Sequence, residues 1–329
     1  MKEIVVGIDI GGTNTVFGLI DKQGNCLFKQ SIKTKKYNQA EDLVLELATQ
    51  IKKSLLELDF AYDLKGFGIG APNGNFFKGT IEFAPNLGWH GVIHLTDMLG
   101  KHFPDKLVLL TNDANAAALG EMIYGAARGM CDFIVITLGT GLGSGIVSNG
   151  ELIYGHDGFA GEIGHTIVYA DGRICGCGRR GCLETYASAT GIVRTMVELL
   201  EKSDKKSILR KSSISQITSM DIYNAAKEGD ELALEAFDFT CKILGFKLAD
   251  AVAYTSPEAI ILFGGLAQAK EFIFESTKKY MEENLLAIYK NKVKIIPSQI
   301  EENNAAILGA SALIWKNIET TQNLICRLM

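Results

Sequence analysis

Two similar stretches of the sequence decide the fold: IVVGIDIGGTNTVFGLIDKQGNCLF at residues 4–28 and FIVITLGTGLGSGIVSNGELIY at residues 133–154. Each pattern predicts a buried strand, a glycine-rich turn, a second strand, a short turn and a third strand. The second stretch repeats the first at an offset of about 128 residues. A single recurrence excludes a solenoid array and predicts a duplicated domain core, with two lobes built on one plan.

The rest of the chain alternates helices with strands, which is typical of α/β lobes. Apolar residues at helical spacing and short apolar runs mark these elements. The predicted helices cover residues 39–58, 113–127, 185–201, 219–228, 230–254, 267–286 and 304–318, and the predicted strands 65–70, 107–111, 258–263 and 293–297. The charged, serine-rich segment 201–213 is interpreted as a solvated loop, with a basic binding patch as the weaker alternative.

Composition narrows the class of protein. A chain of 329 residues with 47% hydrophobic residues and a net charge of -5 fits roughly two folded domains and excludes general disorder. The charge balance leaves no electrostatic footprint for nucleic acid. No apolar run is long enough for a membrane span, and no signal peptide is recognisable, so we expect a cytoplasmic protein. Its seven cysteines are then reduced, which favours metal binding or core packing over disulfides.

The two glycine turns are candidate phosphate sites. In the first turn, Asp9 is followed by Gly11, Gly12, Thr13 and Asn14; the second turn runs through Gly139, Thr140 and Gly141. Backbone N–H groups without side-chain bulk can approach an anion there, and Asp9 could hold Mg²⁺. The alternative is an ordinary hairpin with a solvated aspartate. Because the glycine-rich turn occurs twice, once in each predicted lobe, nucleotide binding is favoured over this alternative. The chain lacks a Walker A motif, and its two G-x-G-x-x-G-like matches, at 66–71 and 176–181, open no helix.

A cluster of metal-ligand residues follows the second turn. Cys175, Cys177 and Cys182 come ten or more residues after His165, and together they meet the Cys₃His requirement of a structural zinc site. A disulfide or four unrelated side chains are the alternatives. The remaining cysteines are isolated, and we expect them to pack in the core: Cys26, Cys131, Cys241 and Cys326.

Three carboxylates have candidate roles in chemistry. Glu162 and Glu184 flank the metal loop, and paired carboxylates suit the hydroxyls of a sugar; surface charge is the alternative. Asn112 is a plausible N-cap, and Asp113 stands where a strand passes into a helix. An aspartate there is a routine choice near a helix N-terminus. It is also the residue type that accepts the proton of an alcohol during phosphoryl transfer, so Asp113 is the candidate general base.

These motifs resemble the ROK family of bacterial sugar kinases and repressors, within the actin/hexokinase/Hsp70 superfamily. The likeness covers essentially the whole chain. It rests on DIGGTNT at 9–15, NDANAAALGE at 112–121, TLGTGLGSG at 137–145, GEIGH at 161–165, CGCGRRGCLETYASATG at 175–191 and FGGLA at 263–267. The zinc motif is the family-specific part. Within the family, NDANAAALGE and LETYASATGI most resemble the glucokinases.

The resemblance implies two ribonuclease-H-like lobes around a central cleft: a small N-terminal lobe over 1–112, joined by the helix 304–318, and a larger lobe over 113–303 that carries the zinc loop. It implies that Asp113 is the base toward the sugar's 6-hydroxyl, and that one ring nitrogen of His165 binds zinc while the other meets a sugar hydroxyl. The implied hexose contacts are Gly74, Asn86, Asn112, Asp113, Glu162, His165 and Glu184. The implied ATP–Mg²⁺ contacts are Asp9, Gly11, Gly12, Thr13, Asn14, Thr140, Gly141, Gly264 and Gly265. The family usually has a Pro-Gly pair where this chain reads Ala71-Pro72-Asn73-Gly74.

The leading prediction is therefore an ATP-dependent hexose kinase that makes glucose 6-phosphate and ADP, and the family likeness implies a homodimer. Related kinases of N-acetylmannosamine, N-acetylglucosamine or fructose remain open, as does polyphosphate as the donor. A sugar-responsive repressor is less favoured, because its DNA-reading module would precede a motif that begins at Asp9, and the chain is near-neutral. A sugar-binding protein without catalysis is the remaining alternative; a chaperone-like ATPase is disfavoured.

Overall fold

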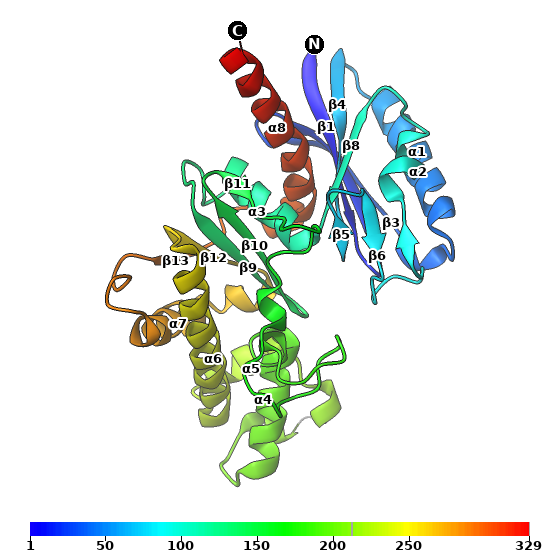
Figure 1. Cartoon of the computed structure of the whole chain (residues 1–329). Coiled ribbons are helices and arrows are strands. Elements are labelled where there is room, and N and C mark those ends of the chain that lie inside the picture. The colour runs from blue at the N-terminus through cyan, green and yellow to red at the C-terminus, as the bar shows by residue number, and fades with distance from the viewer. Residues whose placement is uncertain (212, 329) are drawn as a thin grey trace. The chain divides into compact units, whose positions relative to one another are not determined.

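The computed structural model describes residues 1–211 and 213–328 and contains two compact units. The first unit comprises Met1–Gly129, Leu152–Ala160 and the described chain from Gln299 onward; the second comprises Met130–Glu151 and Gly161–Ser298. Each unit is an α/β structure with its own hydrophobic core (Figure 1).

The first unit is built on a five-stranded sheet in the order β3-β2-β1-β4-β8. β1 pairs antiparallel with β2 and parallel with β4. The main sheet strands are β1 (Lys2–Ile10), β2 (Thr15–Asp21), β3 (Cys26–Ile32), β4 (Tyr62–Gly70) and β8 (Leu107–Thr111); β5 (Gly74–Asn75), β6 (Thr80–Glu82) and β7 (Val92–Ile93) form a small second sheet. The helices are α1 (Ala40–Leu56), α2 (Leu95–Gly100), α3 (Asp113–Ile123) and α8 (Glu302–Leu328).

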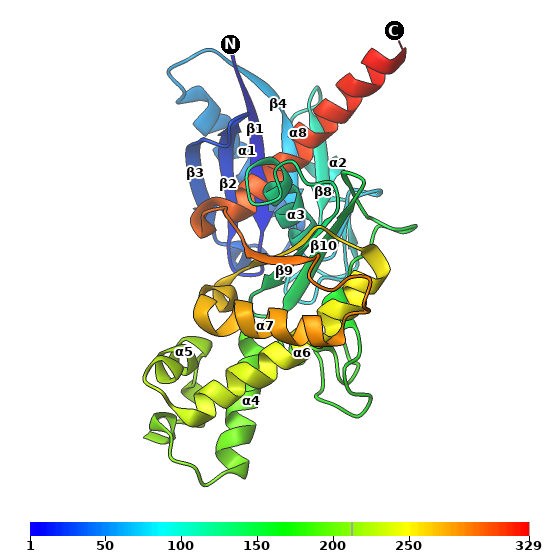
Figure 2. The ribbon, with the colours of Figure 1, turned by 90° about the vertical axis from the view of Figure 1, so that its left-hand side faces the viewer.

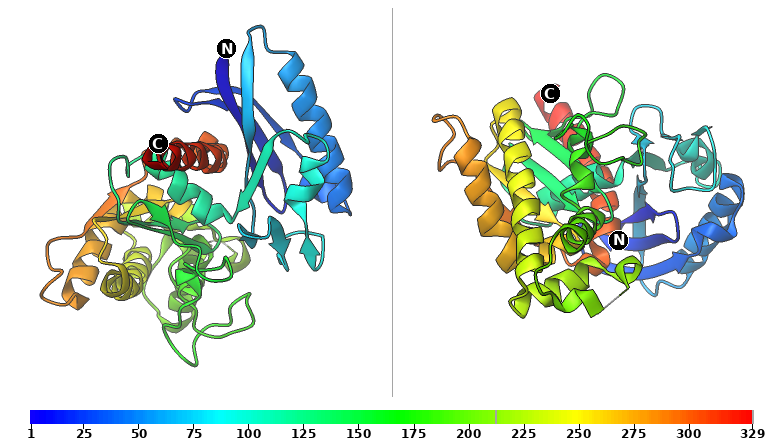
Figure 3. Two further views of the ribbon diagram at one scale, coloured as in Figure 1. Left: turned by 45° about the horizontal axis from the view of Figure 1, so that its top comes forward. Right: turned by 90° about the horizontal axis from the view of Figure 1, so that it is seen from below.

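The two faces of this sheet are covered by different helices (Figure 1). Ile4, Val6 and Ile8 share a core cluster with the apolar residues of α1. The alternate residue Val5 packs with Ile314 and Trp315 of α8 on the opposite face. Figure 3 shows α8 lying against β1 and β4. Asp9 lies four residues after Val5 on the same strand and therefore belongs to the same face, the one that α8 covers.

Glycines let α8 approach the sheet at backbone distance. Gly7 and Gly68 are register partners on β1 and β4. A Cβ atom on Gly68 would lie 1.8 Å from the carbonyl oxygen of Ala310, and one on Gly7 would lie 2.0 Å from that of Ile307. The glycine-rich run at 66–71 is thus a packing surface, which explains a nucleotide-loop-like motif that opens no helix.

The second unit repeats this plan. Its sheet has the order β11-β10-β9-β12-β13, with an antiparallel β9–β10 hairpin in place of β1–β2. The strands are β9 (Phe133–Leu138), β10 (Leu142–Ser148), β11 (Glu151–Leu152), β12 (Ala259–Phe263) and β13 (Lys294–Pro297), and the helices α4 (Ala189–Lys202), α5 (Ser219–Lys227), α6 (Glu231–Thr255) and α7 (Lys270–Asn284). Figure 2 shows α6 and α7 side by side. The predicted duplication of the core is confirmed.

Some details differ from the sequence-based expectations. The structure groups α3 with the first unit, whereas the expected boundary followed residue 112. The reason is glycine packing, since a Cβ on Gly309 of α8 would lie 2.5 Å from the carbonyl oxygen of Ala116 on α3. Helix α3 also ends at Ile123, four residues before the predicted 127. α4 begins at Ala189 and not at 185, because Leu183–Thr185 forms a 3₁₀ helix, η3.

Two expectations about loops and cysteines were wrong in part. The segment 201–213 contains a 3₁₀ helix, η4 (Ile208–Lys211), with Leu209 buried, so it is not a fully solvated loop; Ser212 lies outside the described residues. Cys241 is buried and Cys26 half-buried, but Cys131 is exposed in the loop before β9. The side chain of Cys326 lies outside the described part of the chain. Within that part, no helix is long and apolar enough to cross a membrane.

Candidate active site

The first glycine turn joins β1 to β2 and carries Asp9 near the end of β1. The N–H of Gly11 donates to the carbonyl of Asn14 at 3.0 Å, which closes the turn. A Cβ on Gly12 would lie 2.2 Å from the carbonyl oxygen of Asn86, so only glycine fits there. The structure therefore brings Asn86, an implied sugar contact, against the predicted phosphate turn.

The predicted base, Asp113, lies at the junction of β8 and α3. Asn112 caps the helix as expected: its Oδ1 accepts the N–H of Asn115 at 2.7 Å. Oδ1 of Asp113 accepts the N–H of Ala114 at 2.8 Å, which fixes the carboxylate at the helix N-terminus while its side chain stays accessible to solvent. The loop that follows β4 passes over this junction, since a Cβ on Gly74 would lie 2.4 Å from the carbonyl oxygen of Thr111. Gly74, Asn112 and Asp113 are thus neighbours.

Asp9 and Asp113, both in the first unit, have raised pKa values. Burial of the Asp9 carboxylate, and to a smaller extent the charge of Asp113, raise the pKa of Asp9 to about 7. Although Asp113 reaches solvent, the protein around it excludes much of the bulk water, and this desolvation raises its pKa as well; the N–H of Ala114 acts in the opposite direction. A carboxylate with a raised pKa is suited to accept a proton near neutral pH. A pair of neighbouring carboxylates in such surroundings also suits a divalent cation.

The four predicted metal ligands converge in the second unit. Their donor atoms, from His165, Cys175, Cys177 and Cys182, all lie within 4.8 Å of one another. Cys177 Sγ lies 3.6 Å from Cys182 Sγ, and Cys175 Sγ lies 3.7 Å from His165 Nδ1. Ligands of a tetrahedral zinc ion with ~2.3 Å Zn–S bonds are separated by about 3.8 Å, so the donor set fits zinc. Burial opposes ionisation of Cys177, but hydrogen bonds with Arg179, Cys175 and Cys182 together outweigh it and lower the pKa of this thiol to about 6.

Both flanking carboxylates lie beside the imidazole of His165. Glu184 Oε1 lies 3.8 Å from Nδ1 and also accepts from Cys175 Sγ at 2.8 Å, and Glu162 Oε2 lies 3.9 Å from Nε2. Nδ1 therefore faces the cysteines, while Nε2 faces Glu162. The second glycine turn adjoins the same place, because a Cβ on Gly141 would lie 2.7 Å from Glu184 Oε2.

Gly264 also meets the second glycine turn. It adopts φ +101°, a conformation that favours glycine, and a Cβ there would lie 2.8 Å from the carbonyl oxygen of Leu138, the last residue of β9. Gly265 follows it as the first residue of a 3₁₀ helix, η6 (Gly265–Gln268). The second unit thus gathers Thr140, Gly141 and Gly264 at one end of its sheet.

Arg173 is a residue that the sequence analysis missed. Its guanidinium is 10% exposed, bonds Glu198 at 2.8 Å and the carbonyl of Thr185 at 2.7 Å, and stacks on the ring of Tyr186. It thereby fastens the metal loop to η3 and α4. The only sequence signal is an arginine two residues before Cys175, which a one-dimensional pattern does not distinguish from a surface cation.

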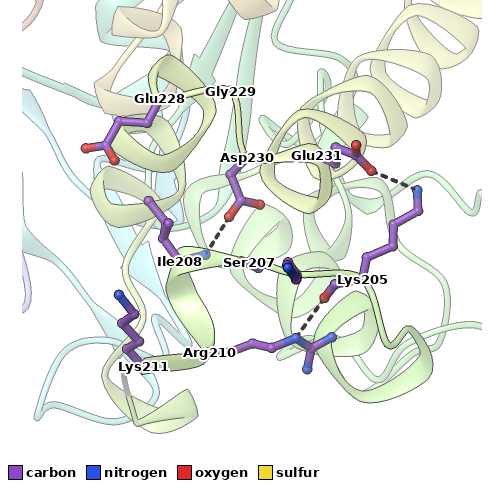
Figure 4. Close-up of a pocket in the computed structure, with 10 residues that line it drawn as sticks. Lys205, Ser207, Ile208, Arg210, Lys211, Glu228, Gly229, Asp230 and Glu231 are labelled. Carbon is purple, nitrogen blue, oxygen red and sulfur yellow. Dashed lines mark hydrogen bonds and ion pairs between the residues drawn. The ribbon is translucent and has the colours of Figure 1, made fainter.

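A separate pocket of about 790 Å³ lies in the second unit, between residues 205–211 and the turn 228–231 (Figure 4). Asp230 Oδ2 accepts the N–H of Ile208 at 2.8 Å and holds the two segments together. Lysines and Arg210 line this pocket, but so do three carboxylates, and Nε of Arg210 is engaged by the carbonyl of Lys205. The mixed lining does not favour the alternative of a basic binding patch.

The family model described as "ROK family" matches residues 5–317, and the chain belongs to this family. It is 34% identical to a glucokinase of Thermotoga maritima over 95% of this chain and 98% of the relative. It is 30% identical to a xylose repressor of Caldicellulosiruptor bescii over 94% of this chain and 77% of the repressor. A solved ROK glucokinase of Streptomyces griseus, in complex with glucose and AMPPNP, aligns with a TM-score of 0.77 at 32% identity, over 94% of this chain and 98% of that one. The predicted fold class, α/β with lobes of the actin/hexokinase type, is confirmed.

Proposed function

We propose that this protein is an ATP-dependent glucose kinase, which transfers the γ-phosphoryl group of ATP to the 6-hydroxyl of glucose and releases ADP. The observation that carries the proposal is Asp113, a solvent-accessible carboxylate with a raised pKa, fixed at the start of α3 by the N–H of Ala114. The similarity to glucokinases over nearly the whole chain supports the same activity.

Asp113 acts as the general base in this proposal. Its carboxylate orients the 6-hydroxyl and accepts its proton as the oxygen attacks the γ-phosphorus. Ala114 N–H holds one carboxylate oxygen, which leaves the other available to the sugar. Gly74, Asn86 and Asn112 belong to the same unit and bind the remaining hydroxyls.

The sugar contacts in the second unit are Glu162, Glu184 and His165. Nε2 of His165 donates to a sugar hydroxyl, while Nδ1 is held on the cysteine side. A zinc ion bound by His165 and the three cysteines has no open position and is structural. With the metal bound, the ring of His165 and both carboxylates would be held in place before the sugar binds.

The two glycine turns bind the ATP phosphates through backbone N–H groups. The residues are Gly11, Gly12, Thr13 and Asn14 in the first turn, Thr140 and Gly141 in the second, and Gly264 and Gly265 toward the adenosine. Asp9 would hold Mg²⁺, which would supply the positive charge that neutralises the phosphates. Burial, and to a smaller extent the charge of Asp113, raise the pKa of Asp9, and a bound cation would favour its ionised form.

The test is ADP release from Mg-ATP with glucose, mannose, fructose, N-acetylglucosamine and N-acetylmannosamine, ranked by kcat/KM, with polyphosphate as a second donor. We expect glucose to lead by tenfold or more. If an N-acetyl sugar leads, the proposed kinase chemistry stands and the sugar named here is wrong. If no sugar releases ADP, the proposal fails.

A sugar-responsive regulator is the second candidate, because xylose repressors match this chain at 30% identity. Binding of a sugar by calorimetry without turnover would favour it, whereas turnover that Asp113→Asn abolishes would exclude it. Family resemblance also supports a cytoplasmic homodimer, which light scattering on the purified protein tests.

A further inference from the structure

The start of α4 holds two of the three carbonyl groups of the second glycine turn, those of Gly139 and Thr140. The N–H of Ala189 donates to the carbonyl oxygen of Gly139 at 2.9 Å, and the hydroxyl of Thr190 donates to that of Thr140 at 2.8 Å. Ala189 is the first residue of α4, so its N–H has no partner within the helix, and the turn supplies one. Thr190 adds a second bond, which comes from its side chain.

Fixing these carbonyls also fixes the direction of two N–H groups. In a trans peptide unit, the C=O of one residue and the N–H of the next point in opposite directions within one plane. The carbonyl of Thr140 belongs to the same peptide unit as the N–H of Gly141, and that of Gly139 to the same unit as the N–H of Thr140. When α4 holds the two carbonyls, these N–H groups point away from the helix. Without such bonds, the flanking glycines would let the peptide planes rotate.

The first glycine turn is held in a comparable way but by a different donor. There the N–H of Thr34 donates to the carbonyl oxygen of Thr13 at 3.0 Å, so the support comes from the backbone. In the second turn, the support for Thr140 is a hydroxyl, which a single substitution removes. The duplicated core therefore reaches a similar arrangement through unrelated residues.

Thr190 is also connected to the metal loop through the chain between them. Ser188 Oγ donates to the carbonyl of Glu184 at 2.6 Å and accepts the N–H of Gly191 at 3.0 Å. Arg173 fastens the same segment, because its Nη1 bonds the carbonyls of Thr185 and Gly191 at 2.7 and 3.1 Å. Ser188 and Arg173 thus tie the start of α4 to the segment that follows the metal loop, and these bonds fix the position of the Thr190 hydroxyl.

We propose that Thr190 is a positioning residue for the nucleotide phosphates: by holding the Thr140 carbonyl, its hydroxyl directs the N–H of Gly141 toward the phosphoryl donor. The inference rests on the proposed function, in which Thr140 and Gly141 bind ATP. It assigns to Thr190 a share of the affinity for ATP and none of the affinity for glucose.

The test compares Thr190→Val, which keeps the shape and removes the donor, with Thr190→Ser, which keeps the donor. Thr49→Val is the matched control, because Thr49 is also an exposed helical threonine whose hydroxyl bonds a backbone carbonyl, that of Leu45 at 2.8 Å. The readouts are KM for Mg-ATP and for glucose, Kd for Mg-AMPPNP by calorimetry, and bound zinc. We expect Thr190→Val to raise KM and Kd for the nucleotide about three- to tenfold, which is the net value of one hydrogen bond. KM for glucose and zinc content stay within twofold of wild type, and Thr190→Ser and Thr49→Val resemble wild type.

Three results overturn the inference. Unchanged nucleotide affinity in Thr190→Val, with an active wild type, refutes it and leaves the proposed function intact. A rise of both KM values by the same factor, or loss of zinc, assigns Thr190 to general support of the fold. If wild-type protein neither phosphorylates a sugar nor binds Mg-AMPPNP, the proposed function fails and the inference fails with it.

Discussion

The close approach of α8 to Gly7 and Gly68 of the sheet gives a quantitative prediction for Gly68→Ala. The added Cβ would lie 1.8 Å from the carbonyl oxygen of Ala310. Ordinary van der Waals contact begins near 3.4 Å, so α8 must move away from the sheet by about 1.6 Å. The obstacle is helix backbone, which cannot rotate aside as a side chain could. We expect the free energy of unfolding of the first unit to fall by about 3 kcal/mol, the upper part of the usual range for an overpacked core.

Tryptophan fluorescence isolates this effect, because the chain has two tryptophans and both belong to the first unit. Trp89 is 6% exposed and Trp315 on α8 is 3% exposed, so both emit from the core until this unit unfolds. Following the emission wavelength as urea is added gives the midpoint of unfolding. A shift of this midpoint at a constant m-value measures the change in stability.

The matched control is Gly100→Ala at the end of α2, where an added Cβ meets nothing within 4 Å. We expect that variant to stay within about 0.5 kcal/mol of wild type or to gain slightly, since alanine restricts the unfolded chain. Equal stability of Gly68→Ala and Gly100→Ala would refute the argument that backbone contact between α8 and β4 requires glycine.

Three further predictions concern the site and the charges. Asp113→Asn should lower kcat by about 10³-fold while the affinity for glucose stays within a few-fold of wild type. In the wild-type protein, kcat/KM should fall as acid protonates Asp113. Near-normal turnover of the variant contradicts the assignment of Asp113 as the base. We expect mass spectrometry to find one zinc ion per wild-type chain and none in Cys177→Ala. The variant should also raise KM for glucose, because His165 and Glu184 lose their anchor; a zinc-free wild type contradicts this prediction. Burial alone would raise the pKa of Asp21, but hydrogen bonds from Lys2 and Asn25 lower it. The first unit should therefore lose stability as the pH falls below about 4, and Asp21→Asn should flatten this dependence. Equal pH dependence of the variant and the wild type would contradict this role of Asp21.

Most of the helices and strands were predictable from local sequence patterns. Strands β1 and β9 were predictable because each is a nearly continuous apolar run that leads into a glycine turn, a pattern contained within a few neighbouring residues. The extent of α3 was not: the helix ends at Ile123, and the following residue, Tyr124, meets Ser311 of α8 at 3.3 Å, a partner 187 positions away. The 3₁₀ helix η4 was missed for a similar reason: within Ile208–Lys211 only Leu209 is buried, and burial is a property of the folded chain.

The sequence alone determined the donor chemistry of the candidate site. Three cysteines and a histidine at short spacing define a metal loop, and the Asn112–Asp113 pair at a strand end defines a capped base, since both depend on residues close together in the chain. Only the tertiary structure decided what supports them. Arg173 as a clamp, Asn86 against Gly12, and Thr190 on Thr140 join residues 12 to 74 positions apart. Such contacts follow from how helices and turns pack, and no local pattern encodes them.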